Sequence, residues 1–130
     1  MILDTDDFEY ISKLLCNSKL LTKDFEEVID MAEEGDLLFI DPPYTLKHNH
    51  NNFIKYNEKL FSWDDQIRLR NCLLNAKERK VHIVAKNANH PCVKELYAEF
   101  ELCDLSRKSL LAANSKKRGA IQELLIKNVI

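Results

Sequence analysis

Glycine is nearly absent from this 130-residue sequence, which has only Gly35 and Gly119. Glycine-rich loops let a backbone close around phosphate or a nucleotide cofactor, and two distant glycines cannot form one. No apolar stretch is long enough to span a bilayer. Met1-Ile2-Leu3 leads directly into acidic residues from Asp4 to Glu9, so the basic segment and apolar run of a signal peptide are missing. We therefore expect a cytoplasmic protein that does not enter a membrane.

Cysteine pairs at metal-binding spacing are also missing. The four cysteines are widely separated, so neither a zinc knuckle nor a redox dithiol is predicted, and buried reduced thiols are expected at Cys16, Cys72, Cys92 and Cys103. His48 and His50 have the spacing of a ligand pair, but no third ligand is spaced to complete a site. We expect no bound metal.

The composition is that of one ordinary globular domain, with 45% hydrophobic and 31% charged residues. The net charge of −2 is unevenly distributed: residues 1–41 hold twelve acidic residues and three lysines, whereas residues 42–130 hold sixteen basic and nine acidic residues. The basic second part is compatible with binding of a polyanion such as nucleic acid. A solvated mixture of acidic and basic surfaces would give the same counts.

Helical spacing of apolar residues predicts four helices. They cover residues 5 to about 15, 24 to about 34, 62 to about 77, and a short segment that begins at Pro91. Thr22 is the predicted N-cap of the second helix, and Gly35 is predicted to end it. Ser62 is predicted to open the third helix.

Apolar runs predict strands over residues 37–40 and 81–85, of the kind that a parallel sheet covers on both faces. Two further strands, over 100–105 and 121–126, follow with no helix between them. Alternating helices and strands closed by such a pair predict a three-layer α/β sandwich with an antiparallel edge, in a single domain.

Asp41-Pro42-Pro43-Tyr44 directly follows the first predicted strand. The two prolines stiffen the turn and remove two N–H donors. The carboxyl end of a parallel strand is where open α/β sheets bind ligands. A carboxylate and a bare carbonyl can each accept one hydrogen of an amino group, and Tyr44 offers a face on which a base can stack. The motif therefore predicts a receptor for a flipped-out amino base, and a purely structural turn is the alternative.

Taken in order, the motifs resemble those of Dam-type DNA adenine-N6 methyltransferases over about residues 22–130. The residues that carry the resemblance are 24–28, 35–44, Asn52, Phe53, Tyr56, Phe61, Asp65, Gln66, Ser109, Arg118 and 123–128.

The resemblance implies S-adenosylmethionine as methyl donor and double-stranded DNA as partner. It implies that Asp41 and the Pro42 carbonyl hold the target N6, with Pro43 in the same turn, that Tyr44 stacks on the adenine, and that Asp41 borders a partial cofactor site. The loop over residues 45–59 would lie near DNA and cofactor, and a second basic loop would contact phosphates. The loop residues concerned are Lys47, Phe53, Lys55, Tyr56, Lys116, Lys117 and Arg118, and for the last three a solvated loop is the alternative.

The sequence departs from this family in three respects. Family members have a glycine-rich loop for the methionine part of the cofactor, an acidic residue for its ribose and an inserted target-recognition domain, and none of these is present. The resemblance is therefore to the carboxyl-terminal half of a Rossmann-like sheet, strands four to seven of seven, with residues 1–21 as the end of the recognition segment.

We expect such a half to have little or no activity alone. A second polypeptide would supply the cofactor-binding half, or the exposed sheet edge would self-associate. Two alternatives remain: a non-catalytic remnant that binds nucleic acid or a partner protein, and an RNA amino-methyltransferase, since the tetrapeptide also occurs in enzymes of that type.

Overall fold

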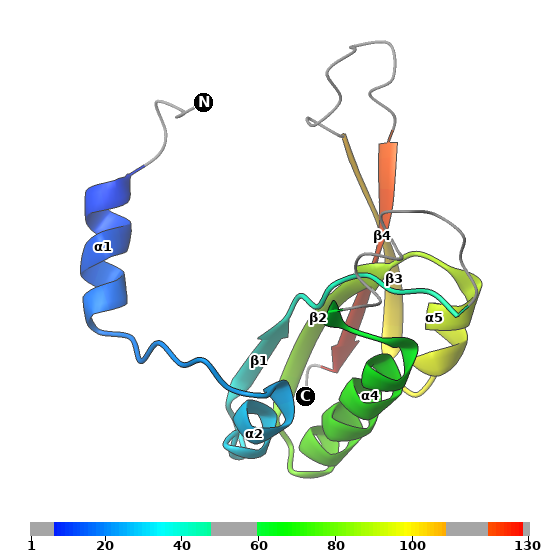
Figure 1. Ribbon diagram of the computed structural model, residues 1–130, viewed down its shortest axis with the longest axis horizontal. Coiled ribbons are helices and arrows are strands. Elements are labelled where there is room, and N and C mark those ends of the chain that lie inside the picture. The colour runs from blue at the N-terminus through cyan, green and yellow to red at the C-terminus, as the bar shows by residue number, and fades with distance from the viewer. Residues whose placement is uncertain (1–6, 48–59, 109–119, 129–130) are drawn as a thin grey trace.

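The structure is a computed structural model that describes residues 7–47, 60–108 and 120–128. Within these residues, a four-stranded sheet has the order β1-β2-β4-β3 (Figure 1). Its strands are β1 (Leu37–Ile40), β2 (His82–Ala88), β3 (Glu101–Lys108) and β4 (Ala120–Asn128). β1 runs parallel to β2, whereas β4 is antiparallel to both β2 and β3. The predicted mixed α/β fold with an antiparallel edge is therefore confirmed.

The described helices are α1 (Phe8–Cys16), α2 (Phe25–Asp30), α4 (Trp63–Glu78) and α5 (Pro91–Leu96). α4 begins where predicted, because Ser62 and Asp65 form a reciprocal capping box in which each side chain accepts from the backbone N–H of the other. α5 begins with a proline, whose missing backbone N–H costs nothing because the first N–H groups of a helix have no partner within the helix.

The predicted limits of α2 are wrong. Its N-cap is Asp24, whose carboxylate accepts from the backbone N–H of Glu26 at 3.0 Å, and the helix already ends at Asp30. Gly35, at φ +89°, belongs to the turn that leads into β1 rather than to the helix end. This turn is closed by the Asp36 carboxylate, which accepts from the backbone N–H of Glu33 at 2.9 Å. The backbone N–H of Glu33 is therefore satisfied by a nearby side chain instead of by a continued helix.

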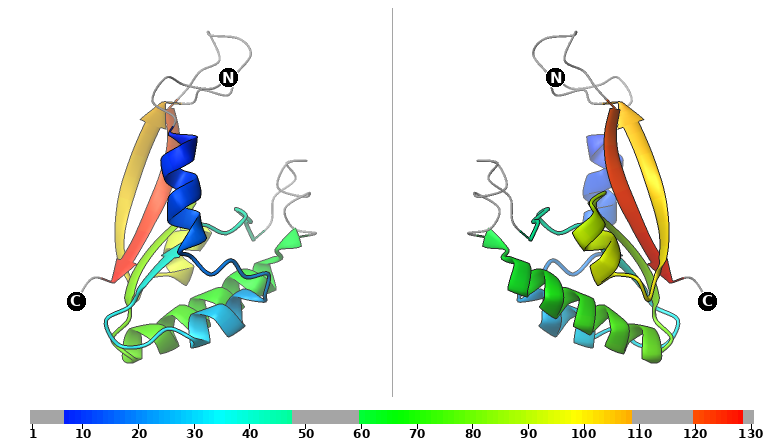
Figure 2. Two further views of the ribbon diagram at one scale, coloured as in Figure 1. Left: turned by 90° about the vertical axis from the view of Figure 1, so that its left-hand side faces the viewer. Right: turned by 90° about the vertical axis from the view of Figure 1, so that its right-hand side faces the viewer.

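One face of the sheet carries the core. The side chains of Gln66 in α4, Asn87 in β2 and Tyr97 after α5 are joined there: Asn87 Nδ2 and Tyr97 Oη donate to Gln66 Oε1 at 3.1 and 3.2 Å. Burial raises the pKa of the Tyr97 hydroxyl. Because one polar cluster links all three elements, α4 and α5 cover the same face (Figure 2). The fully buried apolar residues there include Ile29, Leu73, Ile83, Val93, Leu124 and Ile126.

The opposite face of β1 is open. Leu37 and Phe39 are each 64% exposed, and β2 is the only neighbour of β1 among the described residues. The prediction that β1 is covered on both faces is therefore wrong for this chain, because no described element packs over that side. The described elements form two layers, and the third layer of the predicted sandwich is not confirmed.

Helix α1 stands apart from the sheet (Figure 1). It has no buried residue, although its apolar residues form a stripe: Phe8, Ile11, Leu14 and Leu15 are 47–61% exposed. None of the helices in the described ranges is long and apolar enough to cross a membrane. The four cysteines are free, as expected, but only Cys72 is buried.

Candidate functional site

The Asp-Pro-Pro-Tyr turn lies at the carboxyl end of β1, where a parallel strand points its last residues toward a ligand. The Asp41 side chain is 51% exposed, Pro43 is exposed, and Pro42 and Tyr44 are half-buried. The next two residues, Thr45 and Leu46, are buried and anchor the turn on its other side. The turn therefore presents its carboxylate at the surface instead of folding it into the interior.

An apolar cavity of ≈260 Å³ adjoins this turn. Two of its aromatic walls, Phe25 and Phe61, pack against each other with their ring centroids 5.8 Å apart. The volume is slightly below the range of about 300–1,000 Å³ for pockets that enclose a drug-sized ligand, so the cavity suits a flat ring rather than a whole nucleoside cofactor. Its lining residues are Phe25, Phe39, Ile40, Asp41, Pro42, Pro43, Phe61 and Leu69.

Arg68 of α4 fixes the Phe25 wall of the cavity. Its guanidinium lies 4.0 Å from the centroid of the Phe25 ring and forms two bonds to the Asp24 carboxylate, at 2.7 and 3.1 Å. These bonds from Arg68 lower the pKa of the Asp24 carboxyl. The wall is thus tied to α4 by a cation–π contact and an ion pair.

Both ends of the turn are linked to one buried carboxylate, which belongs to β4. The Tyr44 hydroxyl donates to Glu123 Oε1 of β4 at 3.3 Å, and the Glu123 side chain is only 4% exposed. Lys86 Nζ of β2 lies 3.7 Å from Glu123 Oε2 and 3.9 Å from Asp41 Oδ2. Asp41, Tyr44, Lys86 and Glu123 therefore form one polar cluster.

Sequence reasoning missed Lys86 and Glu123 as members of the site. Of the two, only Glu123 belongs to the motifs that carry the family resemblance, and no role was assigned to it there. A signal for Lys86 was present, because parallel pairing of the two predicted strands places Ile40 beside Ala85, and therefore Asp41 next to Lys86. Glu123 had no such signal, since its strand pairs with β2 from the other end of the chain.

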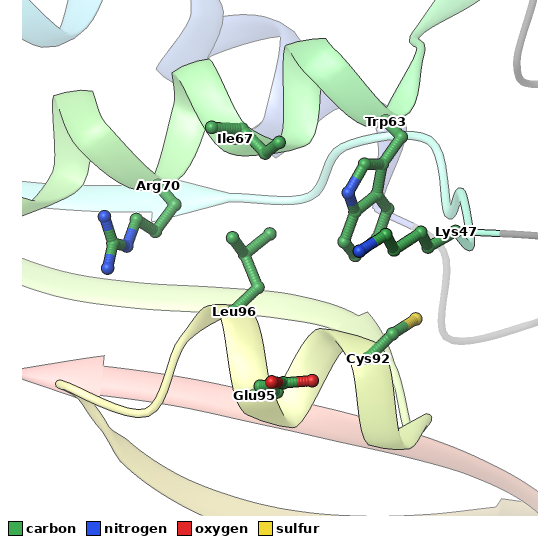
Figure 3. Close-up of a pocket in the computed structure, with 7 residues that line it drawn as sticks. All are labelled: Lys47, Trp63, Ile67, Arg70, Cys92, Glu95 and Leu96. Atoms are coloured by element: carbon green, nitrogen blue, oxygen red, sulfur yellow. The ribbon is translucent and has the colours of Figure 1, made fainter.

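A second cavity, of ≈340 Å³, lies between α4 and α5 (Figure 3). Lys47, the one predicted DNA-contacting residue that the structure describes, lines it together with Trp63. Trp63 is partly buried and also packs against the core. The remaining lining residues are Ile67, Arg70, Cys92, Glu95 and Leu96.

Other predicted site residues lie outside the described residues, and their roles stay predictions. These are Phe53, Lys55, Tyr56, Lys116, Lys117 and Arg118, together with His48 and His50. Within the described ranges, no group of three or more histidine, cysteine, aspartate or glutamate residues is placed to hold a metal ion.

Comparison with known proteins now decides the family. The profile of the D12 class N6 adenine-specific DNA methyltransferases matches residues 2–110 of the chain. The chain belongs to this family. The match to the D12 class begins well before residue 22, the limit that the motifs alone indicated, and it includes α1.

Several named relatives of this D12 chain have similar sequences. The Type II methyltransferase M1.LlaDCHI of Lactococcus lactis subsp. cremoris is 33% identical over 129 residues, which are 98% of this chain and 45% of the relative. The Type II methyltransferase M.MjaIII of Methanocaldococcus jannaschii is 31% identical over the same shares of the two chains. The DNA N-6-adenine-methyltransferase of Escherichia phage P1 is 31% identical over 110 residues, which are 83% of this chain and 15% of the relative. The chain thus spans about half the length of the first two curated relatives.

Proposed function

We propose that this D12 chain forms the target-base part of an S-adenosylmethionine-dependent methyltransferase that acts on the N6 amino group of adenine in DNA. The observation that carries the proposal is the accessible Asp41-Pro42-Pro43-Tyr44 turn at the carboxyl end of β1, in a chain of this family. Asp41 and the carbonyl of Pro42 accept the two hydrogens of the target amine. The Tyr44 ring stacks on the adenine, which must first leave the duplex.

The turn solves a specific chemical problem. The lone pair of an adenine amine is spread into the ring, so the nitrogen is a poor nucleophile. Two acceptors that hold both hydrogens favour a tetrahedral nitrogen whose lone pair points away from the turn, toward the reacting carbon. S-adenosylmethionine, when bound, supplies that carbon as a methyl group, and Asp41 is placed to receive the proton that the amine then releases.

The residues of this chain fit one part of the cofactor site. The cavity beside Asp41 suits a flat ring, and its aromatic walls are apolar. The sequence has no glycine-rich loop to hold the methionine end. The proposal is therefore that further protein, in the same or a second polypeptide, completes the cofactor site.

The open side of β1 is where this further protein would pack. A complete sheet would cover the free edge of β1 and the exposed side chains of Leu37 and Phe39. The apolar stripe of α1 is a second exposed surface. Packing there would add the missing strands and layer of a Rossmann-like sandwich. Residues 1–21, in this proposal, are the end of a target-recognition segment. In isolation the same surface drives self-association.

Double-stranded DNA would approach from the side of the turn. Lys47 is exposed next to it, and the proposed contacts in the two loops are Phe53, Lys55, Tyr56, Lys116, Lys117 and Arg118. Phosphate contacts by these cations would weaken as salt concentration rises.

A chimaeric enzyme tests the proposal. The chain replaces the matched 129 residues of the Lactococcus lactis relative, and methyl transfer from tritiated S-adenosylmethionine to unmethylated plasmid DNA is measured. We expect activity in the chimaera and little or none in the isolated chain. Asp41→Asn removes an acceptor charge and should lower kcat about 10²- to 10³-fold, the usual effect of deleting one charge-stabilising group. Tyr44→Ala should weaken the reaction through lost stacking.

Asp30→Asn is the matched control, because Asp30 is exposed at the end of α2, away from the turn. It should leave activity unchanged. A chimaera that folds and binds DNA but retains full activity with Asp41→Asn would refute the assigned role of the turn. Strong activity of the isolated 130 residues would refute the incomplete cofactor site.

A further inference from the structure

Lys86 occupies an unusual position between two carboxylates. Its Nζ lies 3.9 Å from Asp41 Oδ2 and 3.7 Å from Glu123 Oε2, and the lysine side chain is 26% exposed. A flexible lysine on an open surface would gain little from either contact. Here the Glu123 carboxylate is almost fully buried, so the ammonium group of Lys86 lies between a buried partner and the carboxylate of the turn.

The strand register explains why these groups meet. Ile40 pairs with Ala85 in the parallel β1–β2 ladder, so Asp41 and Lys86 are the next residues on adjacent strands and share a face. In the antiparallel β2–β4 ladder, Lys86 pairs with Leu125 and Ala88 pairs with Glu123. Glu123 is therefore a diagonal neighbour of Lys86 on that face, within reach of a long side chain. This is the face of the sheet that the described helices leave uncovered.

Glu123 serves both ends of the turn. One of its oxygens accepts from the Tyr44 hydroxyl, and the other faces Lys86. A buried carboxylate is stable only when such partners satisfy it. The contact of Glu123 with the Tyr44 hydroxyl fixes the phenol ring, and its contact with Lys86 holds the ammonium group near Asp41.

We infer that Lys86 and Glu123 are positioning residues for the proposed base receptor: Glu123 orients Lys86 and the Tyr44 ring, and Lys86 keeps the Asp41 carboxylate correctly aimed. This inference rests on the proposed function. It adds two residues that contact neither the base nor the cofactor and that act through Asp41 and Tyr44.

The chimaera provides the test, with kcat and the KM for DNA measured separately. Lys86→Met removes the ammonium and keeps most of the side-chain volume, so kcat should fall about 10- to 100-fold through misplacement of Asp41. The KM for DNA should change less than threefold, and Lys86→Arg should restore most of the rate. Glu123→Gln should also lower kcat, and the double variant should lose less than the product of the two single effects, because both residues act through one contact chain.

Lys94→Met is the matched control. Lys94 also forms an ion pair, with Asp104 at 2.8 Å, but this pair joins α5 to β3 and does not contact the turn. It should leave kcat unchanged. Circular dichroism monitors the thermal unfolding of the isolated chain for every variant. These melts show whether a lower kcat comes from the site or from loss of the folded state.

The outcomes distinguish this inference from the proposed function. If Asp41→Asn abolishes activity while Lys86→Met leaves kcat intact, the positioning role is refuted and the proposed function stands. If Lys86→Met instead raises the KM for DNA and flattens its salt dependence at unchanged kcat, Lys86 is a phosphate contact and the inference is wrong. If Asp41→Asn itself has no effect, the proposed function fails first.

Discussion

The exposed apolar face of β1 allows a quantitative prediction about association. Leu37 and Phe39 are each 64% exposed in the isolated chain. Full burial of a leucine or phenylalanine side chain contributes about 1.5–3 kcal/mol, so covering the exposed part of each contributes about 1–2 kcal/mol. The double substitution Leu37→Lys, Phe39→Lys should therefore remove about 2–4 kcal/mol for each copy of this face that the association buries.

The same substitution should have little effect on folding of the chain alone. Both side chains are mostly in solvent already, so the expected loss in free energy of unfolding is about 0.5 kcal/mol or less for each. The loss in association, by contrast, corresponds to a dissociation constant at least about 30-fold larger. The double variant should therefore lose association while it keeps nearly the same free energy of unfolding.

Sedimentation equilibrium over a wide concentration range measures the association, and urea denaturation measures the folding. We expect the parent chain to self-associate and the double variant to associate at least about 30-fold more weakly. Leu105→Lys is the control, because Leu105 lies on the same face but on β3, at the other edge of the sheet, and is 37% exposed. It should associate like the parent. A parent chain that stays monomeric at every concentration, or a double variant that associates as tightly as the parent, would refute the assignment of this face.

Three further predictions concern stability of the chain. Because Arg68 lowers the pKa of Asp24 below its ordinary value of 3.8, the stabilisation from this pair is present above that value and is lost as pH falls through the lowered pKa. Arg68→Met should reduce this acid dependence in thermal melts from pH 5 to 2, and the backbone N–H of Glu26, which also bonds to Asp24, should preserve the rest. Tyr97→Phe removes one donor to Gln66 and should lower the free energy of unfolding by about 1 kcal/mol in urea titrations. Ser62→Ala removes the capping box and should cost about 0.5–2 kcal/mol in the same titrations, with a smaller effect counting against the cap.

Local chemistry explains which elements could be predicted from the sequence. The start of α4 was predictable because a serine cap and an acidic residue three positions later satisfy each other whatever surrounds them. The N-cap of α2 was misplaced, because Thr22 and Asp24 are both acceptable caps and their side-chain geometry decides between them. Patterns of this kind predict that an element exists better than they predict where it ends.

The burial of β1 could not be predicted for a different reason. A continuous apolar run such as residues 37–40 records what the strand contacts in the complete fold, and the sequence pattern does not say whether that contact lies within this chain. The pattern predicts that Leu37 and Phe39 are buried, whereas in this chain both side chains are 64% exposed. In the proposed function, these exposed apolar residues of β1 are the surface on which a further part of the protein packs.

The chemistry of the turn depends on the sheet as a whole. Asp41 is placed by β1, Lys86 by β2 and Glu123 by β4, so the cluster exists only in the observed register of three strands. A slip of one residue in β2 would turn Lys86 to the face covered by helices and would leave Asp41 and Glu123 without the cation between them. The tetrapeptide of residues 41–44, placed in a loop without these strands, would still form a stiff turn, but no neighbouring cation would hold its carboxylate in place. The tetrapeptide supplies the proposed receptor atoms, and the strand register sets Lys86 and Glu123 beside them.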